Sequence, residues 1–173
     1  MPFRTWITAP LLALCLASMP AQAAEAHVHG QARLAVAVDG GTLTLLLASP
    51  ADSLTGFERP PRTAQERAAV AAMRQQLERA DALFLPSPAA ACRLSRVTLV
   101  SPLLGDAPEP GHEGHADLDG TFVFRCAHPE RLNDLDVRLF EHFPRLKSVN
   151  VEIAGPNGQK ALRLRAGQTR ATW

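Results

Sequence analysis

Two runs of alternating apolar and polar residues on either side of a glycine-rich turn constrain the fold of this chain most. In residues 31–38 and in residues 42–49, every second residue belongs to a series of apolar side chains. Asp39-Gly40-Gly41 separates the two runs. A period of two is typical of a half-buried strand, and a turn of this composition joins two strands into a hairpin. The apolar positions are Leu34, Val36, Val38, Leu43, Leu45 and Leu47.

A single long helix is predicted after a proline-containing loop at residues 50–62. Thr63 and Glu66 match a capping box, which opens a helix over residues 64–82. Its apolar residues recur every three or four positions and form one stripe that must pack on the rest of the protein. They are Val70, Met73, Leu77 and Ala80. Met73 is interpreted as a core residue and not as a metal ligand.

More strands are predicted along the rest of the chain, without regular alternation between strands and helices. They fall at residues 93–101, 117–126, 135–139 and 149–153 and after the hairpin turn Pro156-Asn157-Gly158, while residues 140–146 form a helical turn. This order favours an α+β fold, with a mostly antiparallel sheet and one long helix packed on a face. We predict one domain over residues 31–173, with a loop of histidine and acidic residues at 102–117.

The first 23 residues have the three parts of a secretory signal peptide. Arg4 supplies the positive region, an apolar stretch follows, and Ala21-Gln22-Ala23 is a cleavage site of small residues. We predict cleavage after Ala23, export to the periplasm, a short leader at residues 24–30, and no membrane span after cleavage. A retained anchor would need about 20 apolar residues, and a lipoprotein route through Cys15 is disfavoured by bulky Leu14.

The charge balance of the exported part argues against nucleic-acid binding. Without Arg4, 17 basic residues face 17 acidic ones. A nucleic-acid surface needs a basic excess, and stacking on bases needs aromatic side chains, of which this chain has few and no tyrosine. We therefore expect no nucleic-acid partner.

Two cysteines, Cys92 and Cys126, stay in the exported part. An even pair in an oxidising compartment indicates a disulfide. Cys92 precedes one predicted strand and Cys126 ends the next. Antiparallel pairing of these strands brings the cysteines together, so the two predictions support each other. A metal site built from both cysteines is the alternative, but the chain lacks the C-x-x-C spacing.

Six histidines supply the candidate metal ligands. His27 and His29 would share a face of an extended leader, and His112 and His115 lie three residues apart in the loop. Imidazole and carboxylate groups suit zinc, nickel or copper, and four of them close a tetrahedral zinc site. The carboxylates beside the loop histidines are Glu113, Asp117 and Asp119.

Other interpretations of these residues stay open. A solvated loop and a frayed terminus would carry the same histidines without function. His142 lies among Phe140, Phe143 and Leu146 and favours a structural role, while His128 precedes a proline and reads as a turn residue. No hydrolase, nucleotide-binding or H-E-x-x-H motif occurs, so no enzyme is predicted. A metal-dependent hydrolase with Glu113 as general base is the remote alternative.

Several short segments occur in an order that resembles the ZrgA-like family of zinc-regulated periplasmic zinc-binding proteins of Gram-negative bacteria. The resemblance implies an α/β protein that binds zinc through histidines, here His27, His29, His112 and His115 with Glu113 or Asp117, and that supports zinc uptake. Family loops are often longer and richer in histidine. The segments are His27-Val28-His29-Gly30, Ala48–Ala51, Gly56-Phe57-Glu58, Leu83–Pro86, Cys92, Phe122–Cys126, Leu135–Val137, Leu139-Phe140 and Phe143-Pro144.

The function predicted from the sequence is that of a periplasmic zinc chaperone or buffer. Its partners would be the zinc ion and a solute-binding protein of a zinc-uptake system. A structural or interaction domain of the cell envelope, whose histidines are incidental, is the alternative.

Overall fold

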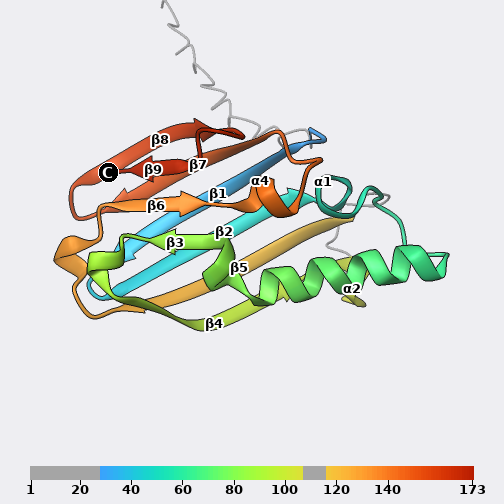
Figure 1. The fold of residues 1–173 in the computed structure, drawn as a ribbon, viewed down its shortest axis with the longest axis horizontal. Coiled ribbons are helices and arrows are strands. Elements are labelled where there is room, and N and C mark those ends of the chain that lie inside the picture. The colour runs from blue at the N-terminus through green and yellow to red at the C-terminus, as the bar shows by residue number, and fades with distance from the viewer. Residues whose placement is uncertain (1–27, 107–115) are drawn as a thin grey trace, which may run out of the picture.

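Two stacked sheets make up the core of the protein (Figure 1). The computed structural model describes residues 28–106 and 116–173. The larger sheet has six strands in the order β4-β5-β2-β1-β7-β8. Their bounds are β1 Gln31–Asp39, β2 Thr42–Pro50, β4 Cys92–Val100, β5 Asp117–Cys126, β7 Ser148–Gly155 and β8 Gly158–Leu164.

The first hairpin follows the predicted alternation. Strands β1 and β2 pair antiparallel with Val36 opposite Leu45, and the alternate apolar residues of both strands point into the core. Gly40 in the turn has φ +52°, a left-handed conformation that favours glycine. The hairpin is therefore confirmed.

A smaller sheet covers one face of the larger sheet. It consists of β3 (Phe84–Pro86), β6 (Asp134–Val137) and β9 (Arg170–Thr172), in the order β3-β6-β9. Figure 1 shows this sheet in front of the six-stranded one. The ring of Phe84 on β3 packs against the ring of Phe122 on β5, with 5.0 Å between their centroids. Apolar side chains from both layers thus form one core.

The described residues contain several helices, where the sequence predicted one long helix. The long helix, α2 (Ala64–Glu78), begins with the predicted capping box and buries Val70, Met73 and Leu77. It ends four residues early, and α3 (Ala80–Leu83) follows after Arg79. The shorter elements are α1 (Ala51–Thr55), which lies in the predicted loop, α4 (Leu139–His142), and three 3-10 turns at Pro88–Ala90, Pro102–Leu104 and Pro129–Arg131.

The prediction of a sheet-rich fold with helices is confirmed, but its detail needs correction. Strand β1 pairs parallel with β7, so the larger sheet is mixed. The face expected to carry one long helix is covered largely by the smaller sheet, while α2 lies near the β4 edge (Figure 1). Among the described helices, none has the length and apolar character needed to cross a membrane.

The predicted disulfide is present. Strands β4 and β5 pair antiparallel, Cys92 lies opposite Cys126, and the two form a disulfide. The other end of this strand pair carries the histidine and acidic loop, of which residues 107–115 lie outside the described residues. The disulfide therefore closes the β4–β5 segment that holds this loop.

Candidate metal-binding site

Gly30 fixes the chain directly after His29. Its N–H donates to the buried Ser53 hydroxyl at 2.9 Å, and its carbonyl accepts from the N–H groups of Lys147 and Ser148. Gly30 has φ +78°, and an added Cβ would lie 3.2 Å from the Arg145 carbonyl oxygen. A side chain at this position would be strained and crowded. Glycine is therefore required at position 30 by its left-handed backbone conformation and its close packing, and this backbone places His29 beside α1.

His29 lies between two carboxylates. Its Nε2 is 3.1 Å from Glu58 Oε1, and its Nδ1 is 3.8 Å from Asp52 Oδ2. The His29 side chain is 62% exposed, whereas those of Asp52 and Glu58 are 24% and 12% exposed. Asp52 belongs to the first turn of α1, and Glu58 follows the left-handed Gly56 that ends this helix. The two carboxylates therefore approach the imidazole ring from its two nitrogen atoms.

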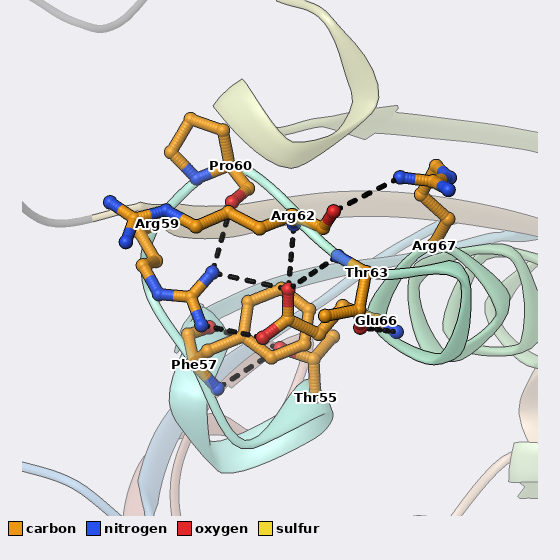
Figure 2. Close-up of polar contacts among 8 residues, drawn as sticks. All are labelled: Thr55, Phe57, Arg59, Pro60, Arg62, Thr63, Glu66 and Arg67. Carbon is orange, nitrogen blue, oxygen red and sulfur yellow. Dashed lines mark hydrogen bonds and ion pairs between the residues drawn. The ribbon is translucent and has the colours of Figure 1, made fainter.

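The loop that carries Glu58 is held on both sides by its neighbours (Figure 2). Before Glu58, the Thr55 hydroxyl donates to the carbonyls of Ala51 and Phe57, each at 3.0 Å. After it, the Arg59 guanidinium lies over the Phe57 ring, 5.7 Å from its centroid. These contacts fix the backbone on both sides of Glu58.

A network of hydrogen bonds around Glu66 joins this loop to the start of α2. Arg59 donates two hydrogen bonds to the Glu66 carboxylate, which also accepts from the N–H groups of Arg62 and Thr63. The Thr63 hydroxyl accepts from the Glu66 N–H in return, which completes the capping box (Figure 2). The Arg59 guanidinium and then the Arg62 N–H lower the pKa of Glu66 from 4.5 to about 2.

Replacing Glu66 with glutamine is expected to flatten the acid dependence of stability. A carboxylate whose pKa is lowered by folding stabilises the protein above its unfolded pKa, and this contribution is lost as pH falls toward about 2. Urea unfolding at about pH 6 and about pH 3 measures the effect. Wild type should lose more stability between these conditions than Glu66→Gln. Exposed Glu152→Gln is the control and should behave as wild type; an equal loss in Glu66→Gln would contradict the prediction.

Ala116, the first described residue after the histidine and acidic loop, lies next to the segment that carries Asp52 and Glu58. Ala116, which follows His115 in sequence, donates its N–H to the Glu58 carbonyl at 3.2 Å and accepts from the Ala51 N–H at 2.9 Å. Asp117, the next residue, opens β5 opposite Pro50 and is half-buried. The residue after the loop is thus bound to both ends of the segment whose carboxylates face His29.

The structure describes two of the six predicted metal ligands. His29 and Asp117 are as given above, and His27, His112, Glu113 and His115 lie outside the described residues. Within residues 28–106 and 116–173, no group of three or more histidine, cysteine or acidic side chains is arranged to hold a metal ion. The described part therefore offers a two-donor pair, His29 Nε2 and Glu58, and no complete metal centre.

The remaining histidines stand apart from this pair. His128 immediately precedes the 3-10 turn at Pro129–Arg131, in agreement with its prediction as a turn residue. It lies just after the end of β5 at Cys126, whereas Asp117 is at the start of this strand. His142 ends α4 and is exposed, although Phe140 and Phe143 beside it are buried. His142 was predicted to have a structural role among Phe140, Phe143 and Leu146; its exposed side chain is not part of the buried cluster that these three residues join.

Sequence reasoning missed the two carboxylates that face His29. Asp52 and Glu58 lie in a segment that was predicted to be an irregular loop, more than twenty residues from the leader. The signal that could have identified Glu58 was the segment Gly56-Phe57-Glu58. It was used above only to support the family resemblance, and Glu58 was not considered as a ligand. Its position beside His-x-His-Gly follows from the β1–β2 hairpin, which brings the end of β2 back to the start of β1.

Imidazole and carboxylate groups are both donors that divalent transition-metal ions accept, and His29 and Glu58 place one of each side by side at one end of the larger sheet. A model of the ZrgA family, described as zinc uptake proteins, matches residues 26–173. The chain belongs to this family, so the resemblance noted in the sequence is confirmed. Among curated proteins, none matches the chain.

Proposed function

We propose that this protein binds zinc in the periplasm and supports zinc uptake as a chaperone or buffer, without catalysis. Family membership supports the role in zinc uptake. The proposed export would remove residues 1–23, and the mature chain would start at Ala24. The proposed ligands are His27, His29, His112 and His115, with Glu113 or Asp117 as a supplementary ligand.

One observation carries the proposal that leader and loop serve a single site. Gly30, next to His29, is bound to Ser53 of α1, and Ala116, next to His115, is bound to Ala51 and Glu58. The residues that flank both histidine-bearing segments are thus bound to residues 51–58, which supports a single site. Two histidines leave a zinc ion half-coordinated by water, whereas ligands from both segments can close a tetrahedral shell.

The exposure of His29 suits a protein that exchanges its metal. A chaperone must present its ion to a partner, and a ligand that is 62% exposed can be replaced by an incoming donor. The partner we propose is a zinc-binding protein of the uptake system, such as a periplasmic solute-binding protein.

A zinc titration of the mature protein against a chromophoric chelator tests the proposed function. We expect one ion to bind at neutral pH. Zinc affinity should fall steeply as the pH is lowered from about 7.5 to about 5.5, because zinc binds only the neutral imidazole and protons compete with it for the ring nitrogen. No binding, or an affinity that does not change over this pH range, would contradict a histidine site and would favour a structural or interaction role.

A further inference from the structure

We propose that Glu58 is a direct zinc ligand together with Nε2 of His29, and that Asp52 positions the imidazole from its other side. This inference rests on the proposed zinc-binding function and specifies its ligands. It assigns a ligand role to Glu58 and a positioning role to Asp52, two carboxylates that sequence reasoning did not select. It adds Glu58 to the ligands proposed above.

The separation of the two donor atoms fits a shared zinc ion. Zinc binds histidine nitrogen and carboxylate oxygen at about 2.0–2.1 Å, so two donors at a tetrahedral angle lie roughly 3.3 Å apart. His29 Nε2 and Glu58 Oε1 are 3.1 Å apart. The two donor atoms are therefore close to the separation that a shared zinc ion requires.

The Glu58 carboxylate is also held in place for this role. Its side chain is 12% exposed, and the contacts of Phe57 and Arg59 fix the backbone on either side of it (Figure 2). The Glu58 carbonyl is bound to the Ala116 N–H. A ligand that is ordered before the ion arrives loses less conformational entropy on binding.

Asp52 lies on the side of the imidazole away from the proposed ion. Zinc binding at Nε2 requires a neutral ring, so the remaining ring proton must lie on Nδ1. Asp52 Oδ2 lies 3.8 Å from Nδ1, which is longer than a hydrogen bond, so Asp52 must shift its side chain toward the ring to accept the Nδ1 proton. A carboxylate behind a metal-bound histidine fixes the ring tautomer and increases its basicity. Because the two carboxylates face different nitrogen atoms, only Glu58 can share an ion with Nε2, and Asp52 is a positioning residue.

Zinc titrations of three variants test this assignment in the mature protein. Glu58→Gln removes the ligand charge with little change of shape, Asp52→Asn does the same at the positioning residue, and exposed Glu152→Gln is the matched control. We expect Glu58→Gln to lower zinc affinity by more than about tenfold, Asp52→Asn by about tenfold, and Glu152→Gln not at all. Urea unfolding of the metal-free proteins separates loss of affinity from loss of fold.

The outcomes distinguish this inference from the proposed function. Zinc binding by wild type with unchanged affinity in Glu58→Gln would overturn the inference and leave the proposed function intact. No zinc binding by wild type would overturn both. If Glu58→Gln does not fold, Glu58→Asp takes its place; it keeps the charge, withdraws the carboxylate by one methylene, and should still lower zinc affinity.

Nitrogen-15 NMR of the His29 ring gives a readout that a structural role of Asp52 would not change. In zinc-loaded wild type, we expect Nε2 to show the shift of a metal-bound nitrogen and Nδ1 to carry the proton. In Asp52→Asn, the preference for this tautomer should weaken. Metal on Nδ1 in wild type would overturn the assignment of both carboxylates.

Discussion

Replacing His27 and His29 together is expected to lower zinc affinity by about 100-fold or more, and replacing His112 and His115 together should cost about as much. In the proposed site each pair would supply at least one ligand of the closed shell, and its loss would leave the ion partly coordinated by water. The quadruple variant should lose little beyond either double variant, because ligands that act as a unit give non-additive losses.

Chelator competition on the four proteins checks this expectation. The double variant at the exposed residues His128 and His142 is the matched control, since it removes the same number of histidines but leaves the leader and the loop unchanged. Its affinity should equal that of wild type. Two independent sites would give a different result: each double variant would lose one separate ion, and the losses would add in the quadruple variant.

Removal of the Cys92–Cys126 disulfide is expected to lower the free energy of unfolding by about 3–4 kcal/mol. The bond joins residues 34 positions apart and so restricts a long loop of the unfolded chain. Urea unfolding of the Cys92→Ser, Cys126→Ser double variant, compared with oxidised wild type, measures the difference.

The reductant supplies the control for this prediction. A phosphine reductant should lower the stability of wild type to that of the double variant and should not affect the double variant itself. A loss of less than about 1 kcal/mol in both comparisons would contradict the assigned contribution. Zinc affinity measured on the same samples shows how far the site depends on the β4–β5 pair, which carries the loop.

The local structure could be predicted from the sequence wherever a pattern was long enough to be read. The alternation of Leu34 and Val36 with their neighbours predicted β1, and the Thr63 and Glu66 pair predicted the start of α2. Cys92 and Cys126 carried more information, because a disulfide between strand ends requires antiparallel neighbours. Their position in register confirms that argument.

The parts that the sequence did not reveal depend on contacts between distant segments. Strands β3 and β9 have three residues each, too few to show alternation. Periodicity identifies β7 as a strand but cannot show that it lies parallel to β1. The end of α2 at Glu78 could not be predicted either. Ala80 continues the apolar spacing of the helix, although the helix is interrupted at Arg79.

The candidate site likewise has one residue that the sequence could identify and two that it could not. His29 could be selected by its residue type and spacing, which are local properties. Glu58 and Asp52 could not, because an isolated carboxylate in a loop has no pattern that distinguishes a ligand from a solvated side chain. Their proximity to His29 results from the β1–β2 hairpin and from the hydrogen bond between Gly30 and Ser53.

Zinc K-edge X-ray absorption of the mature protein, loaded with one equivalent of zinc, tests the central claim most directly, because it reports the ligands themselves. We expect four nitrogen or oxygen ligands at about 2.0–2.1 Å, with the outer-shell scattering of at least two imidazole rings. A six-coordinate oxygen shell without imidazole scattering would contradict it.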